Sequence, residues 1–100
     1  MPRTLTVSRV RVSAGRDAEY LAAVRELAAL HQARGRRLWL FRRAGEPGRF
    51  LECSESAEAG RHRAVAAPAD DERRIEARIR AVADYEDGSW DLWEEVRSES

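Results

Sequence analysis

The 100-residue sequence contains no lysine, no asparagine and a single cysteine, Cys53. One cysteine cannot build a disulfide framework or a cysteine-based metal cluster, so we predict neither a metal site nor a cofactor. All 18 basic residues are arginines, and 18 acidic residues balance them. This balance argues against a nucleic-acid-binding protein. We attribute the exclusive use of arginine to the codon bias of a GC-rich bacterial genome.

Long hydrophobic runs are also missing. The N-terminal stretch MPRTLTVSRV lacks the apolar segment of a signal peptide, and no other segment has the length needed to cross a bilayer. We therefore expect a cytoplasmic protein whose partners are neither membranes nor nucleic acids.

Large apolar residues are scarce. Alanine accounts for 17 of the 43 hydrophobic residues, which leaves 26 larger ones for a single domain spanning residues 1–100. This supply is thin for a domain that must offset the entropy of ordering its chain. Pairing of two subunits would bury additional apolar surface, so the composition favours a homodimer.

Hydrophobic periodicity and turn residues divide the chain into strands and helices. The stripe formed by Tyr20, Val24, Leu27 and His31 gives the clearest helix signal. The predicted elements are, in order, a strand at Thr4–Val12, a helix at 16–34, a β-hairpin at 38–56, a short weak helix at 56–67, a firmer helix at 70–85 and a strand at 89–96.

This order is β-α-β-β-α-β, which is typical of the α+β ferredoxin-like fold. The fold has a four-stranded antiparallel sheet with two helices on one face. The first strand should then lie between the third and the fourth, with the second strand beyond the third. The other face of the sheet is bare unless a second subunit covers it.

The hairpin LWLFRRAGEPGRFLECSES has large apolar residues on both faces of its first strand, where a half-solvated sheet would alternate with polar residues. If residues 43 and 49 face each other, one face of the hairpin carries Trp39, Phe41, Leu51 and Cys53. The opposite face then carries Leu38, Leu40, Arg42, Phe50 and Glu52. We assign the first set to the side under the helices and the second to the side facing a partner. The two faces exchange roles if the pleat is inverted.

The chain resembles the dimeric α/β-barrel superfamily in the order and residue pattern of its elements. The resemblance is carried by the stretches TVSRVRVSAGRDAEYLAAVRELAALHQARG, LWLF, PGRFLECSES and AEAGRHRAVAA-P-ADDE. The most similar branches of the superfamily are the antibiotic-biosynthesis-monooxygenase-like and NIPSNAP-like domains. The resemblance implies two ferredoxin-like sheets packed face to face in a barrel, with a small pocket in each subunit. The haem-degrading branch uses an Asn on the first strand, a Trp near the second helix and a His on that helix. This sequence has no Asn and no Trp between Trp39 and Trp90, so only His62 could match. The resemblance therefore does not extend to haem degradation.

Glu52 and His62 are the candidate catalytic residues. We expect Glu52 and Arg9 to lie on neighbouring strands and to share the barrel interior. A carboxylate there is either a proton-transfer group or one half of an arginine ion pair. His62 lies between two arginines and is either a proton shuttle at the pocket edge or a solvated side chain. The predicted ligand pocket consists of Arg9, Leu38, Leu40, Arg42 and Phe50.

Two functions remain open at the level of sequence. The favoured one is a homodimer that binds a small hydrophobic molecule or serves as an assembly module. The alternative, implied by the resemblance, is a cofactor-independent monooxygenase-like or isomerase-like enzyme that acts on a small aromatic or polyketide-type compound. A hollow barrel interior would favour a ligand-binding or catalytic role, whereas an interior filled by side chains would leave only the structural role.

Overall fold

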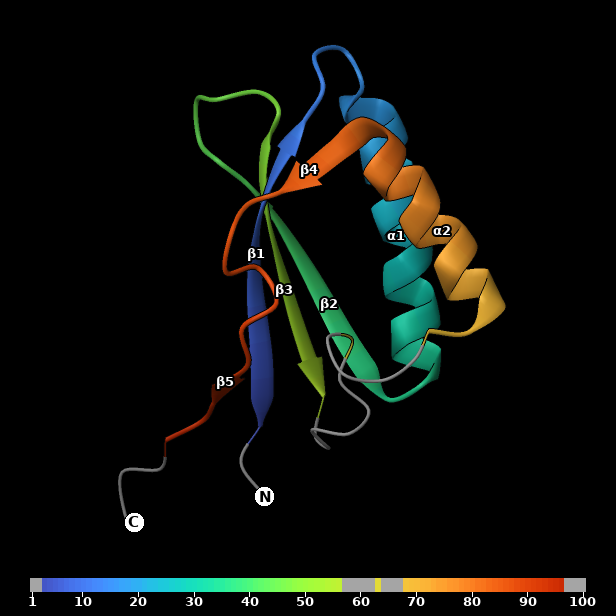
Figure 1. The fold of residues 1–100 in the computed structure, drawn as a ribbon, viewed down its shortest axis with the longest axis vertical. Helices are drawn as coiled ribbons and strands as arrows, with labels where there is room; N and C mark the ends of the chain where they lie inside the picture. Colours follow the sequence, from blue (N-terminus) through green and yellow to red (C-terminus); the bar gives the residue numbers. More distant parts are fainter. Residues whose placement is uncertain (1–2, 57–62, 64–67, 97–100) are drawn as a thin grey trace.

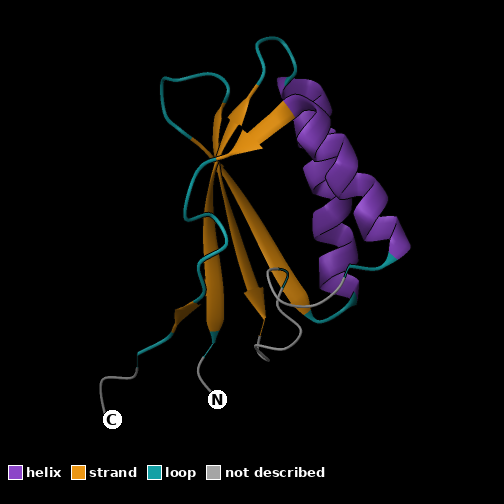
Figure 2. Ribbon diagram, viewed as in Figure 1, coloured by secondary structure: helices purple, strands orange, loops and turns teal. Residues whose placement is uncertain are grey.

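The computed structural model describes residues 3–56, 63 and 68–96 (Figure 1). It has two layers, an antiparallel sheet and a pair of helices that cover one face of it (Figure 2). This arrangement confirms the predicted ferredoxin-like fold. The elements are β1 (Thr4–Val12), α1 (Asp17–Ala33), β2 (Arg36–Arg42), β3 (Arg49–Ser56), α2 (Asp70–Val82), β4 (Ala83–Tyr85) and β5 (Trp93–Glu94).

The strand order and the hairpin register are as predicted. The strands are ordered β2-β3-β1-β4, and β5 also pairs with β1, so β1 lies between β3 on one side and the two short C-terminal strands on the other. In the hairpin, Phe41 is opposite Leu51 and Trp39 is opposite Cys53. The AGEPG turn and the alternation of the two arms were sufficient to define this pairing.

The assignment of the two sheet faces was wrong. The side chains of Phe50 and Glu52 are buried on the helix-covered face, whereas Trp39 and Phe41 are 36% and 54% exposed on the open face. Alternation identifies which residues share a face, but here both faces are apolar and the pattern does not say which one the helices cover. The crossover from β1 through α1 to the parallel strand β2 decides this, because such connections are right-handed.

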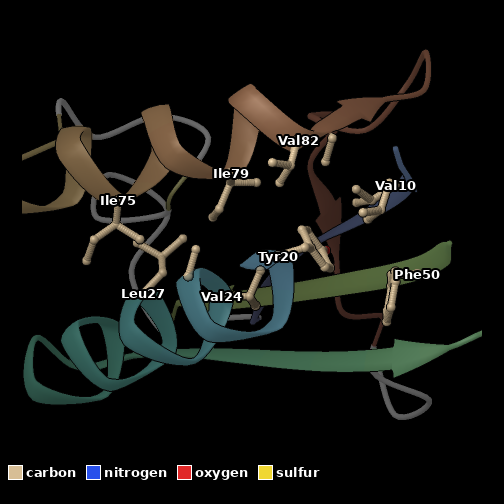
Figure 3. Close-up of a cluster of buried hydrophobic side chains, with 11 residues drawn as sticks. Val10, Tyr20, Val24, Leu27, Phe50, Ile75, Ile79 and Val82 are labelled. Atoms are coloured by element: carbon tan, nitrogen blue, oxygen red, sulfur yellow. The ribbon is translucent and has the colours of Figure 1, made fainter. Parts of the chain in front are cut away.

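The core lies between the helices and the covered face of the sheet. Four residues of the predicted stripe on α1 are buried there, and α2 contributes its own apolar row (Figure 3). The members of this core larger than alanine are Val10, Val12, Tyr20, Val24, Leu27, Phe50, Ile75, Ile79 and Val82.

The C-terminal part of the chain differs from the prediction. Helix α2 ends at Val82 instead of residue 85, because Ala83 is already extended and β4 pairs with the end of β1. The predicted strand at 89–96 is reduced to β5, which pairs with Thr4 and Leu5. Between β4 and β5 the chain leaves the sheet, and the Ser8 hydroxyl donates to the carbonyl of Ser89 at 2.8 Å.

The predicted helix at 56–67 lies outside the described residues, apart from its first residue, which ends β3, and Arg63. Neither helix in the described ranges is long and apolar enough to cross a membrane.

The turn between β2 and β3 offers a matched test of its geometry. Gly45 and Gly48 both have φ of +76°, which strains any residue with a side chain. A Cβ atom on Gly48 would lie 3.1 Å from the carbonyl oxygen of Val12, whereas one on Gly45 would meet nothing within 4 Å. We expect Gly45→Ala to lower the free energy of unfolding by about 1 kcal/mol and Gly48→Ala to lower it further. Urea unfolding measures both, and equal losses would contradict the close approach.

Candidate functional site

Glu52 on β3 is fully buried under the helices and lies at the centre of a polar cluster. Its Oε2 atom accepts a hydrogen bond from the hydroxyl of Tyr20 on α1 at 2.5 Å. The hydroxyl of Tyr85 on β4 lies 2.9 Å from Oε1 and 3.0 Å from Oε2. The guanidinium of Arg63 donates to Oε1 at 2.6 Å. Both carboxylate oxygens therefore have partners, and these come from three different parts of the chain.

Arg63 precedes α2 and is itself buried, with its side chain 3% exposed. Besides Glu52, its guanidinium donates to Glu76 at 3.2 Å and to the hydroxyl of Tyr85 at 3.0 Å. It also lies over the ring of Trp90, 4.9 Å from the centroid. Burial alone would lower the pKa of Arg63, but Tyr85, Glu52 and Glu76 outweigh it and the pKa is raised. A cation is therefore fixed beside the carboxylate at every physiological pH.

The two tyrosines are donors in this cluster. Burial, followed by the nearby Glu52 carboxylate, raises the pKa of Tyr20. Burial also raises the pKa of Tyr85, against the opposing influence of Arg63. Both phenols therefore stay protonated at neutral pH and donate hydrogen bonds to Glu52.

Glu52 forms an ion pair, but its partner is Arg63 and not the predicted Arg9. Arg9 is exposed on the open face, where it is opposite Leu51, and the residue opposite Glu52 on β1 is Ser8. The prediction that Arg9 shares a face with Glu52 was wrong, because the register puts Arg9 one residue out of phase. A buried carboxylate is tolerated only when charge and hydrogen bonds compensate it, and Arg63 with the two tyrosines supplies both.

Four of the five predicted pocket residues lie together. Leu38, Leu40, Arg42 and Phe50 line a hollow of about 360 Å³ between α1 and β2, which we call the α1–β2 groove. Helix α1 contributes its other lining residues, which are Leu21, Val24, Arg25 and Ala28. Glu52 is not among the lining residues, and His62 lies outside the described residues. The groove and the Glu52 cluster are therefore separate features of the covered face.

Sequence reasoning missed the roles of Tyr20, Tyr85 and Arg63, and also a row of small hydroxyl side chains. Alternate residues of β1 and β3 place these hydroxyls on the covered face, where all are buried: Thr4, Thr6, Ser8, Ser54 and Ser56. The signal was present in the sequence, because hydroxyl residues alternate with larger ones along both strands.

A second ion cluster forms at the start of α2. Glu72 accepts hydrogen bonds from Arg36 and from the backbone N–H of Ala69, and it lies 2.8 Å from Arg34. The imidazole of His31 is 3.6 Å from the same carboxylate. Burial alone would raise the pKa of Glu72, but the Ala69 N–H and the two arginines outweigh it and lower the pKa below 4.5. The cluster ties the end of α1 and the start of β2 to α2.

No group of three or more His, Cys, Asp or Glu side chains that could hold a metal ion occurs among the residues that the structure describes.

The fold is that of the antibiotic-biosynthesis-monooxygenase-like proteins. SnoaB, a cofactor-independent oxygenase from Streptomyces nogalater, is 22% identical over 100% of this chain and 97% of its own, with a TM-score of 0.70. A Caulobacter crescentus protein classed with the antibiotic biosynthesis monooxygenases is 17% identical over 96% of this chain and 92% of its own, with a TM-score of 0.72. A similarly classed protein from Bordetella bronchiseptica is 17% identical over 97% and 98%, with a TM-score of 0.71. No protein-family model and no curated protein matches the sequence.

The lowered pKa of Glu72 predicts an acid-sensitive part of the stability. A carboxyl with a pKa depressed by folding contributes stability that is present above the unfolded pKa, near 4.5, and is lost as the pH falls through the folded pKa. We expect the free energy of unfolding to decrease below about pH 4.5, and Glu72→Gln to be less stable at neutral pH with a shallower decrease in acid. Urea unfolding from pH 3 to 7 measures this, with Glu19→Gln on the exposed side of α1 as the control. Parallel pH profiles for the parent and Glu72→Gln would contradict the assignment.

Proposed function

We propose that this protein is a homodimer in which two open sheet faces pack together, and that each subunit binds a small hydrophobic molecule in the α1–β2 groove. The observation that supports both parts is that β2 has large apolar side chains on each face. The described residues of one subunit leave Trp39 and Phe41 exposed on one side and leave the groove beside Leu38 and Leu40 unfilled on the other.

The open face has the character of an interface. Trp93, which is 59% exposed, lies opposite Leu5 on β1, and together with Trp39 it lines a hollow of about 370 Å³. Clustered aromatic side chains on the surface of a small protein mark interaction sites, and sheets bury such faces by packing on each other. A second copy also supplies the apolar burial that the composition of one subunit lacks.

The α1–β2 groove has the character of a ligand site. Its volume of about 360 Å³ lies in the range of small-molecule pockets, and six of its eight lining residues are apolar. The groove lies on the helix side of the sheet, so packing of the two open faces would leave it accessible.

The dimer is tested by placing a charge in the proposed interface. Phe41→Glu would bury a carboxylate against a partner's apolar face, so we expect the dimer to dissociate into monomers. Multi-angle light scattering at micromolar concentration measures the mass, with Ala22→Glu on the exposed face of α1 as the control. A parent protein that is monomeric at this concentration, or a Phe41→Glu variant that remains dimeric, would contradict the proposed interface.

The second candidate function is a cofactor-independent oxygenase-like or isomerase-like enzyme. The specific observation in its favour is the buried carboxylate of Glu52 beside two phenols, in a fold shared with SnoaB. Against it, the described partners of Glu52 occupy both of its oxygens, as expected for a residue whose role is structural.

Glu52→Gln separates the two roles. We expect this variant to lose about 3 kcal/mol of stability, because it leaves the buried guanidinium of Arg63 with less compensating charge. Glu55→Gln is the matched control on the same strand, since Glu55 pairs with the exposed Arg3. Urea unfolding and light scattering measure stability and assembly, while oxygen uptake with anthrone measures turnover. An enzyme would be indicated instead if the parent consumed oxygen and Glu52→Gln lost this activity while keeping its stability and mass.

A further inference from the structure

Resting on the proposed function, we propose that the ligand of the α1–β2 groove is a small amphiphilic anion. Its apolar body would lie against the groove, and its carboxylate or equivalent acidic group would be held at the rim by Arg25 and Arg42.

The floor of the groove selects an apolar body. The apolar lining residues come from two elements that face each other, α1 and the β2–β3 hairpin: Leu21, Val24, Ala28, Leu38, Leu40 and Phe50. The backbone of β2 beside this lining is at the edge of the sheet, so no further strand of the described chain closes the groove on that side. Apolar burial is non-directional and would admit many compounds, so the selectivity must come from the rim.

The rim is basic, and no acidic residue from the described ranges of the chain lines it. Arg25 and Arg42 are the remaining two of the eight lining residues. Within the described part of the chain neither forms an ion pair, although Arg42 lies over the ring of Phe50 at 5.7 Å. The neighbouring acids are already engaged elsewhere.

Those acids have specific partners. On α1, Glu26 follows Arg25 in sequence but receives a hydrogen bond of 2.6 Å from Arg78 on α2. In the hairpin turn, Glu46 lies 3.3 Å from Arg49 and 3.7 Å from Arg43. Among the residues that the structure describes, Arg25 and Arg42 therefore have no acidic partner, in a protein whose total charge is balanced.

A neighbouring hollow along the edge of β2 is also lined by arginine and apolar side chains. It has a volume of about 390 Å³, shares Arg25, Ala28 and Leu38 with the groove, and adds Arg37 to the lining. None of its lining residues in the described part of the chain is acidic. The guanidinium of Arg37 lies over the ring of Trp39 at 5.4 Å. Arginine side chains therefore line both hollows beside β2, and guanidinium groups recognise carboxylates with two parallel hydrogen bonds.

A pair of probes that differ in charge tests this inference. The probes are 2-naphthoate and the neutral 2-naphthalenemethanol, which have the same apolar body. Equilibrium binding to the full-length protein is followed by the naphthalene fluorescence, and the site is located by amide chemical-shift changes in an NMR titration. We expect the naphthoate to bind about fivefold more tightly at low salt, and this preference to decline as salt is added.

Variants assign the preference to the rim. Arg25→Gln and Arg42→Gln each replace the guanidinium with a shorter, neutral polar side chain, and each should reduce the preference for naphthoate towards unity. Arg74→Gln, an exposed arginine on α2 outside the groove, is the control and should leave the preference unchanged. Ala28→Trp should fill the groove and weaken both probes, while Ala22→Trp on the exposed face of α1 should weaken neither.

The outcomes separate this inference from the proposed function. Equal binding of the two probes, both blocked by Ala28→Trp, would overturn the preference for an anion while leaving the groove as a ligand site. Binding of either probe that Ala28→Trp does not affect, or binding of neither, would overturn the groove as a ligand site and the inference with it. A naphthoate preference that survives both glutamine substitutions would overturn the role of Arg25 and Arg42.

Discussion

The buried ion pair between Glu52 and Arg63 is the interaction around which the covered side of the molecule is organised. A carboxylate removed from water requires a cation and hydrogen-bond donors, and these come here from separate elements. Tyr20 links α1 to Glu52 through a hydrogen bond, and Tyr85 links β4 to it in the same way. Through Glu76, Arg63 also reaches α2. We interpret the directional bonds of this cluster as the means by which a small core with few large apolar residues specifies one arrangement of helices and sheet.

The topology and the hairpin register were predictable because they depend on local signals. The alternation in β1, the apolar stripe on α1 and the AGEPG turn each define an element or a pairing without reference to the rest of the chain. The identity of the covered face was not predictable in this way. Both faces of β2 are apolar, so hydrophobicity gives the same answer for either orientation, and the handedness of the β1–α1–β2 connection decides between them.

The candidate site was predictable only in part, since Glu52 was found and its partners were not. Arg63 belongs to a segment rich in alanine and arginine, where no periodic signal distinguishes one arginine from the next. Tyr85 was assigned to the end of a helix, because helical propensity continues to that point and only pairing with β1 draws the chain into a strand. Arg9 was predicted as the partner of Glu52 because the prediction placed β1 one residue out of phase with β3.

The two edges of the sheet have a consequence for the behaviour of the protein at high concentration. An apolar sheet with long free edges can recruit further strands and polymerise. Here the edge beside β1 is divided into β4 and β5, of three and two residues, and β2 begins and ends with arginine. Short, interrupted and charged edges discourage strand addition. In the proposed homodimer, the subunits would therefore associate through the broad face of the sheet and not by adding strands at its edges.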